Sequence, residues 1–211
     1  GFDLEVPPVL AADQPLGWRN KLSFHIRWGE GRALVGFFRQ GSHHVVDLAS
    51  CPVGAMEHAG ALTAVKRWIA AARIPVYEEQ TGEGLLRHLV LRSTRDGERR
   101  LAVLVASRRA PSLSAIRDVL MPASGPRYAD GVFLNVQPAR GNAIYGGETL
   151  RLGWLETLEE SLGGLTFLVS PTSFFQMNPA QAERLYETAL SFLPSGTKSF
   201  IDLYCGTGTL T

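Results

Sequence analysis

The sequence predicts an α+β domain with a mostly antiparallel sheet, followed by the truncated start of a Rossmann-like α/β domain. Residues 18–28 alternate apolar and polar side chains, which is the period of a half-buried strand. Arg95-Asp96-Gly97 separates two apolar runs, and Asp-Gly is a strong signal for a β-hairpin. Near the end of the chain, a helix, a short apolar run and a glycine loop follow one another, as they do where a doubly wound domain begins.

The first strands should form a hairpin. A glycine-rich turn separates residues 18–28 from a second apolar run at 33–38, and a short apolar run follows at 45–48. The alternation predicts that one face of the first strand is apolar and carries Leu22, Phe24, Ile26 and Trp28.

The middle of the chain adds one long helix and more strands. Apolar residues recur every three or four positions over 53–73, which predicts an amphipathic helix. Strands are expected at 85–93 and 100–107, a short helix at 111–121, and further short strands within 131–170.

The pattern changes near residue 171, and we place the domain boundary at about residue 165, giving domains of 1–165 and 166–211. Asn178 is a suitable N-cap for a helix over 179–193, and Gln181 stands where it would complete a capping box. Residues 199–204 read as a short buried strand leading into the glycine loop. An exposed apolar patch is expected on this helix and strand, because a doubly wound sheet would provide their neighbours.

Composition excludes several classes of protein. Hydrophobic residues make up 45% of the 211 residues and charged residues 19%, so the chain can bury a core and is not compositionally disordered. No run reaches the roughly 18 apolar residues of a membrane span, so no membrane partner is expected. Cys51 and Cys205 are too few for a disulfide framework and indicate a reducing, cytoplasmic compartment.

Charge is unevenly divided along the chain. Residues 1–110 hold 15 Lys and Arg against 11 Asp and Glu, whereas residues 111–211 hold 6 against 9. Arg accounts for 18 of the 21 cations, and its guanidinium fork suits phosphate. Composition alone neither shows nor excludes a nucleic-acid partner.

The glycine loop is the first candidate for chemistry. Gly206 and Gly208 directly follow the expected strand, where the lack of a Cβ lets backbone approach a ligand. A dinucleotide fingerprint would need Gly at position 211, where Thr211 stands, and a phosphate-binding P-loop would need a Gly-Lys pair that is absent. The remaining readings are the first motif of S-adenosylmethionine-dependent methyltransferases, with Asp202 ahead of it, or a plain strand-exit turn.

A longer set of motifs is more specific. Residues 170–179 read SPTSFFQMNP and residues 202–211 read DLYCGTGTLT. Upstream, 17–24 reads GWRNKLSF, 36–39 reads GFFR and 51–52 reads CP. In this order, along nearly the whole chain, these segments resemble the RNA uridine-5-methyltransferase family, which makes 5-methyluridine in tRNA and bacterial 23S rRNA.

The resemblance implies particular site residues. S-adenosylmethionine would contact Gln176, Tyr204 and Thr209, although the family often has Asn where Thr209 stands. The glycine loop that supports this contact would comprise Asp202, Gly206 and Gly208. Phe174 would stack on the target uracil once that base is extruded, whereas an ordinary core role is expected for one of Phe174 and Phe175. RNA is the implied partner, with rRNA favoured over tRNA.

The two cysteines have different expected roles. Family members with a [4Fe-4S] cluster take the fourth ligand from a Cys-Pro position like Cys51-Pro52, with three cysteines from a preceding segment, so Cys51 is a candidate metal ligand. The alternative is a small buried thiol. Cys205 belongs to the cofactor motif, and we do not expect it to be a nucleophile.

The family's chemistry requires groups that we do not assign here. A thiolate adds to uracil C6, the resulting enolate attacks the methyl sulfonium, and a base then removes the C5 proton. The resemblance places that nucleophile and that base after residue 211, so we name no catalytic residue and expect this fragment alone to be inactive. A non-catalytic RNA-binding or assembly module is the alternative.

Four cations near the first hairpin are candidates for RNA contact. They could form a face that meets phosphates, and a solvated sheet face is the alternative reading. The four are Arg19, Lys21, Arg27 and Arg39.

Overall fold

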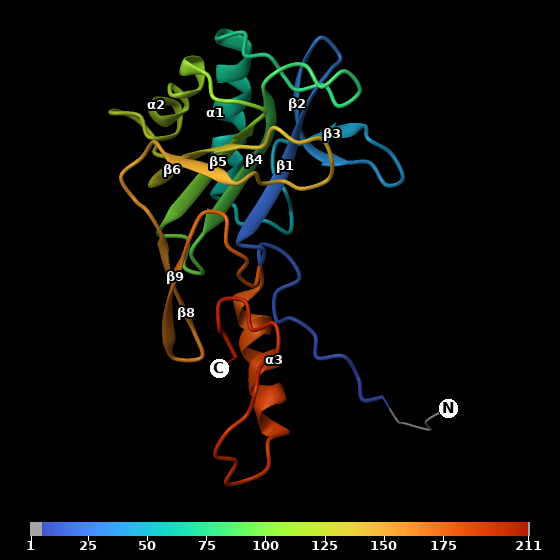
Figure 1. Cartoon of the computed structure of the whole chain (residues 1–211), viewed down its shortest axis with the longest axis vertical. Helices are drawn as coiled ribbons and strands as arrows, with labels where there is room; N and C mark the ends of the chain where they lie inside the picture. The colour runs from blue at the N-terminus through green and yellow to red at the C-terminus, as the bar shows by residue number, and fades with distance from the viewer. Residues whose placement is uncertain (1–5, 211) are drawn as a thin grey trace.

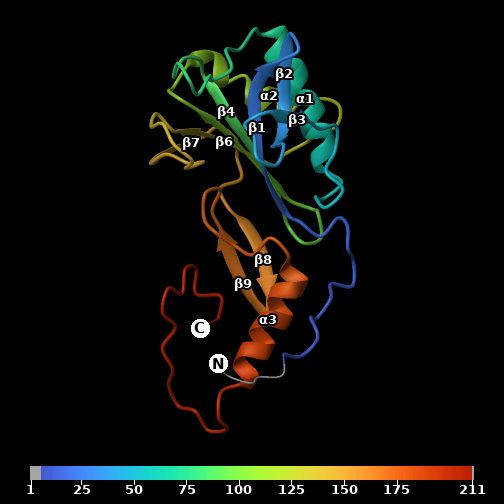
Figure 2. The same cartoon turned by 90° about the vertical axis from the view of Figure 1, so that its right-hand side faces the viewer.

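The structure is a computed structural model that describes residues 6–210. Two lobes follow one another along the long axis of the molecule (Figures 1 and 2). One lobe contains a seven-stranded sheet with helices α1 and α2 on one face, and the other contains the β8–β9 hairpin and helix α3. The N-terminal segment runs beside α3 in both views (Figures 1 and 2).

The large sheet confirms the prediction of a mostly antiparallel α+β domain. Its strand order is β3-β2-β1-β4-β5-β6-β7, and only β5 and β6 are parallel. The chain crosses between these two strands through a short 3-10 turn and α2, as a parallel pair requires. The strands are β1 (Lys21–Gly29), β2 (Arg32–Phe38), β3 (Val45–Asp47), β4 (Leu86–Ser93), β5 (Arg100–Ala106), β6 (Gly131–Val136) and β7 (Glu148–Arg151).

Helices α1 (His58–Ala71) and α2 (Ile116–Leu120) cover one face of this sheet, where the first core lies. Leu22, Phe24 and Ile26 point into that core and are fully buried, as the alternation predicts. Trp28 departs from the prediction: it is 63% exposed, because β1 there extends beside the last turn of α1, which covers it only in part.

Helix α1 begins later than its apolar periodicity predicts. Residues 53–57 form turns because their backbone is paired elsewhere. Arg19 N donates to Val53 O at 2.8 Å, and Ala55 N donates to Arg19 O at 3.1 Å. A non-local backbone pairing therefore overrides the local helical pattern.

The second lobe packs against the opposite face of the sheet. It consists of β8 (Leu158–Leu162), β9 (Leu165–Val169) and α3 (Pro179–Ser191). A second core joins the sheet to this lobe, and its buried members are Val90, Leu101, Val103, Val105, Phe133, Leu158, Leu162, Val169, Phe175 and Ala182. This core fixes the chain immediately before α3. The predicted boundary at residue 165 lies at the start of β9 and remains a prediction.

The start of α3 confirms half of the expected capping box. Asn178 Oδ1 accepts a hydrogen bond from Gln181 N at 3.2 Å, as an N-cap should. The Gln181 side chain, however, donates to Leu10 O at 2.9 Å. The expected return contact to Asn178 is thus replaced by a contact with the N-terminal segment.

The strand predicted for 199–204 is not formed. These residues are extended or turning, and no described strand pairs with them. A strand needs a neighbour for its N–H and C=O groups, and an apolar run alone does not supply one. Ile201 and Leu203 are exposed, as are Leu185 and Phe192 on and after α3, which agrees with the expected apolar patch.

Candidate functional site

One cavity brings together most of the residues that the sequence singled out. Its volume is about 220 Å³, and it lies between the segment after β9, the side of α3 and the C-terminal loop. Every expected cofactor or base contact lines it except Gly208. These lining residues are Phe174, Gln176, Asp202, Tyr204, Gly206 and Thr209.

The C-terminal loop is shaped by left-handed backbone and held to α3. Gly206 and Gly208 have φ of 61° and 72°, a region that glycine enters without a Cβ clash. Tyr204, with φ of 65°, also adopts this region although it carries a side chain. Thr209 Oγ1 donates to the hydroxyl of Tyr186 at 2.9 Å.

Tyr186 is a cavity residue that the sequence reasoning missed. It lies on α3 and lines the same cavity as the glycine loop. Its place in the predicted helix 179–193, directly after Leu185, was the available signal. The contact with Thr209 itself joins two segments that no local pattern connects.

The two adjacent phenylalanines have opposite surroundings. Phe175 is 3% exposed and packs in the second core, with its ring centroid 5.7 Å from that of Phe167. Phe174 is 66% exposed and borders the cavity. The core role therefore belongs to Phe175, and Phe174 is the ring that a ligand can reach.

The loop that carries Phe174 is anchored to the large sheet. Arg92 Nη2 donates to Ser173 O at 2.8 Å, and Asn20 N donates to Met177 O at 3.0 Å. The hydroxyl oxygens of Ser170 and Ser173 are hydrogen-bonded at 2.8 Å, which closes the turn between these residues. The ends of β1 and β4 thus hold both sides of the cavity segment.

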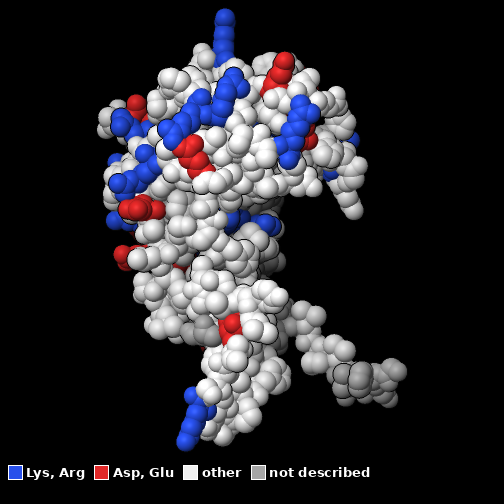
Figure 3. All heavy atoms as spheres, in the orientation of Figure 1, with Lys and Arg blue, Asp and Glu red and all other residues white. Residues whose placement is uncertain are grey.

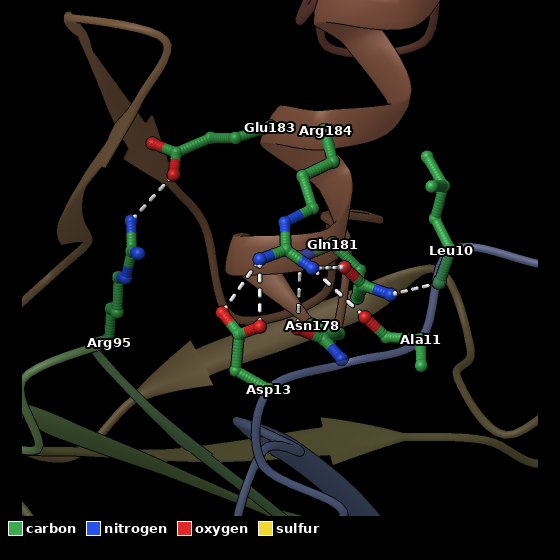
Figure 4. A network of polar contacts seen from close by, with 8 residues as sticks. All are labelled: Leu10, Ala11, Asp13, Arg95, Asn178, Gln181, Glu183 and Arg184. Atoms are coloured by element: carbon green, nitrogen blue, oxygen red, sulfur yellow. Dashed lines mark hydrogen bonds and ion pairs between the residues drawn. The ribbon is translucent and has the colours of Figure 1, made fainter.

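Helix α3 is held from two sides (Figure 4). On one side, Arg184 Nη2 contacts both carboxylate oxygens of Asp13 at 2.9 and 2.7 Å, and Arg184 Nη1 donates to Ala11 O at 2.9 Å. On the other side, Arg95 Nη1 contacts Glu183 at 2.9 Å. The helix that supplies Tyr186 is therefore clamped between the N-terminal segment and the β4–β5 turn.

The four cations that were candidates for phosphate contact differ in their ion pairing and in their exposure. Arg27 forms an ion pair with Glu79, so its charge is compensated. Arg19 and Lys21 have no carboxylate partner within residues 6–210 and lie at the start of β1, whereas Arg39 is exposed after β2. Figure 3 shows Lys and Arg gathered over the sheet lobe, with few on the α3 lobe in that view.

Aromatic and imidazole rings lie on the sheet face that bears Arg27. The rings of His25 and Phe38 stack with centroids 3.9 Å apart, and His43 lies 5.1 Å from Phe38. The Arg27 guanidinium is 5.4 Å from the Phe38 centroid. Rings beside cations are the chemistry of single-stranded RNA binding.

The cysteines do not form a metal centre by themselves. Cys51 is partly buried and packs against the first core, and Cys205 is exposed beside the cavity. No group of three or more possible metal-ligating side chains occurs in the described part of the chain. Cys51 would supply one thiolate at most, so these residues do not fit a [4Fe-4S] cluster on their own. Within the same residues, no helix has the length and apolarity of a membrane span.

Comparison with known proteins adds independent information. No protein-family model matches the chain. An uncharacterized RNA methyltransferase of Thermosynechococcus vestitus is 37% identical over 208 residues, covering 97% of this chain and 45% of that protein. One from Bacillus cereus is 33% identical, covering 99% of this chain and 45% of that protein.

The structural comparison agrees with these relatives. The crystal structure of a Pyrococcus abyssi tRNA (uracil-54, C5)-methyltransferase with S-adenosyl-L-homocysteine matches with a TM-score of 0.76 and 25% identity. The match covers 96% of this chain and 46% of that one. This chain thus spans about half the length of the proteins it matches. It belongs to the RNA uridine-5-methyltransferase family.

Proposed function

We propose that this chain is part of an S-adenosylmethionine-dependent methyltransferase that forms 5-methyluridine in RNA, with rRNA as the first substrate to test. The observation that carries the proposal is the convergence of six expected contact residues on one cavity. These residues come from two segments, 174–176 and 202–209, on either side of α3, so the meeting of the two segments is not a consequence of local structure. The relatives' names support an RNA substrate, and the ligand of the Pyrococcus abyssi protein supports the cofactor.

The residues around the cavity fit such a cofactor. The Gln176 amide can both donate and accept hydrogen bonds, and the Asp202 carboxylate can accept from hydroxyl or ammonium groups. Gly206 leaves its backbone open to close approach, and Tyr204 offers an uncovered ring. S-adenosylmethionine would supply the methyl group as an electrophilic sulfonium. In this proposal residues 166–211 form the first edge of a Rossmann-like methyltransferase domain.

Phe174 provides the expected place for the base. An exposed ring at the mouth of a cavity can stack on a uracil that has left its helix, and stacking on aromatic side chains is worth about 1–3 kcal/mol per base. The large sheet lobe would act as the RNA-binding domain, with His25 and Phe38 on the face that bears Arg27. RNA held on both surfaces would place one nucleotide at the cavity.

The attacking thiolate is not assigned to a residue of this chain. Cys51 does not line the cavity, and Cys205 lies in the loop that we assign to the cofactor. A cysteine elsewhere in the full-length protein would add to uracil C6 and make C5 nucleophilic. We also propose that this fragment has no methyltransferase activity alone. Whether an iron–sulfur cluster uses Cys51 depends on thiolates that the described residues do not provide.

Equilibrium binding of S-adenosylmethionine to the full-length protein tests the cavity assignment. Gln176→Ala should weaken binding about tenfold or more, because it removes polar contacts in a partly enclosed site. Gln80→Ala is the matched control, since Gln80 is exposed on the sheet lobe and should leave binding unchanged. Equal affinity of wild type and Gln176→Ala would remove the cavity from the proposal.

A non-catalytic RNA-binding module is the second candidate. The stacked His25–Phe38 pair beside Arg27 favours it, since that face could bind RNA without any methyl transfer. Binding of RNA by the full-length protein without detectable S-adenosylmethionine affinity would select this alternative.

A further inference from the structure

Three cationic side chains meet where β1 begins and β4 ends, close to the junction of the two lobes. Lys21 and Arg92 are opposite each other in the antiparallel register of these strands. Arg19 precedes β1, and its Nε donates to the carbonyl oxygen of Lys21 at 3.1 Å. Arg92 also bonds Ser173 O, so this cationic cluster touches the loop that presents Phe174.

The charge of the cationic cluster is not compensated. None of its three members pairs with a carboxylate among residues 6–210. Arg92 is only 4% exposed, and its Nε and Nη1 have no hydrogen-bond partner there. Buried arginines are normally paired, and like charges opposite each other in a sheet repel.

One carboxylate, that of Glu160, acts electrostatically on Arg92 without forming an ion pair with it. Glu160 is buried on β8 and accepts a hydrogen bond from Arg95 N at 3.2 Å. Burial raises the pKa of Glu160, and even the ionised carboxylate is a single negative charge beside three cations. The cationic cluster therefore carries a net positive charge, and part of that charge lies on the buried Arg92 side chain.

An anion would reach this cluster through its solvent-facing members. The free nitrogens of Arg92 are closed to water, whereas Lys21 and Arg19 are only half-buried. The Lys21 ammonium lies 5.3 Å from the centroid of the Tyr145 ring. Burial first, and then Arg92 and Arg19, lower the pKa of Lys21 to about 8, so an arriving anion would stabilise its charged form.

We propose that Lys21 and Arg19, with Arg92 beneath them, form a subsite for one backbone phosphate of the bound RNA. This inference rests on the proposed function, because the base on Phe174 determines which phosphate arrives. Ser173 and Phe174 are consecutive, and neighbouring Cα atoms are about 3.8 Å apart, so a nucleotide stacked on Phe174 brings its phosphates near the cluster. Such a phosphate contact sets the register of the strand without reading its sequence.

The lysine content of the chain offers a direct measurement. The sequence contains only three lysines, Lys21, Lys66 and Lys198. Reductive methylation with ¹³C-formaldehyde labels every lysine of the full-length protein, and the variants Lys21→Arg, Lys66→Arg and Lys198→Arg identify the NMR signals of these three. Lys66 pairs with Asp47 and Lys198 is exposed beyond α3, so both serve as internal controls.

The probes would be a uridine trinucleotide with phosphodiester links, its uncharged methylphosphonate analogue, and inorganic phosphate. We expect the Lys21 signal to shift saturably with the phosphodiester, at least about fivefold more weakly with the analogue, while the Lys66 and Lys198 signals stay in place. A Lys21 signal that does not move, or that moves equally with both trinucleotides, overturns the subsite. A response to inorganic phosphate but not to the trinucleotide overturns its assignment to RNA.

A salt titration of RNA binding provides a second readout in the same protein. Lys21→Met should lower the slope of log affinity against log salt by about 0.7, the value for one phosphate contact on a single strand. Lys198→Met should leave the slope unchanged. If methyl transfer to RNA is absent while the Lys21 signal still responds to the phosphodiester, the proposed function fails and the subsite stands. If methyl transfer occurs and Lys21→Met leaves the slope unchanged, the subsite fails alone.

Discussion

Replacing each of the two adjacent phenylalanines by alanine separates packing from ligand contact at the cavity. Phe175 is 3% exposed in the core that joins the lobes, and Phe174 is 66% exposed. Phe175→Ala should therefore destabilise the protein strongly with little direct effect on bound ligands. Phe174→Ala should leave the fold nearly intact while weakening contact with RNA.

The expected magnitudes follow from burial. Deleting a buried phenylalanine ring costs about 3–5 kcal/mol of unfolding free energy, from lost transfer energy and the cavity left behind. A phenylalanine buries roughly 200 Å² when fully covered, so the one third of Phe174 that is covered contributes about 1.7 kcal/mol at 25 cal/mol per Å². Residual burial in the unfolded chain lowers this to about 1 kcal/mol. The two variants should thus differ by about 2–4 kcal/mol.

Urea denaturation of both variants, followed by circular dichroism and tryptophan fluorescence, measures this difference. To distinguish the response of the two lobes, amide exchange in β8, β9 and α3 should be recorded beside exchange in the large sheet. Phe175→Ala should speed exchange mainly in the smaller lobe. Equal losses for the two variants, or a larger loss for Phe174→Ala, would refute the assignment of Phe175 to the core.

Three further outcomes are expected. Burial lowers the pKa of His58 to about 4 and that of His88 to about 3, so both side chains are neutral in the folded protein at pH 5. Histidine in the unfolded chain takes up a proton near pH 6.5. The free energy of unfolding should therefore be about 2 kcal/mol lower per residue at pH 5 than above pH 6.5. A urea midpoint that stays constant between pH 8 and pH 5 would contradict this. Arg184→Met, which removes the ion pair with Asp13, should cost at most about 1 kcal/mol overall because the pair is exposed, yet should release amide protection at residues 10–13; unchanged exchange there would show that the N-terminal segment is held otherwise. Cys205→Ala in the full-length protein should retain methyl transfer within a few-fold, and its loss would make Cys205 the candidate nucleophile.

Much of the fold could be predicted from local patterns. The alternation of Leu22, Phe24 and Ile26 identifies β1 and its buried face, because period two is intrinsic to a strand. The strand predicted for 199–204 is wrong for the converse reason, since pairing depends on neighbours that the pattern does not contain. The late start of α1 has the same origin, because Arg19 pairs with the backbone at Val53.

The cavity could be predicted only in part. The motifs identified Gln176 and the glycine loop, since short motifs carry residue types that contact ligands. The contact between Tyr186 and Thr209 and the clamp of Arg184 on Asp13 were missed, because each joins segments whose proximity depends on the completed fold. The sequence likewise could not show which of Phe174 and Phe175 is buried, because that depends on where the second lobe packs.

The measurement that tests the central claim most directly is tritium release from RNA carrying [5-³H]uridine. The full-length protein, given S-adenosylmethionine, should release one tritium for each methyl group transferred, because C5 exchanges its hydrogen for the methyl carbon. Phe174→Ala should slow release, whereas Phe192→Ala, which removes an exposed ring at the far end of α3, should not. Methyl transfer that retains the tritium would show that another atom is modified, and it would contradict the assignment of this chain to a uridine-5-methyltransferase.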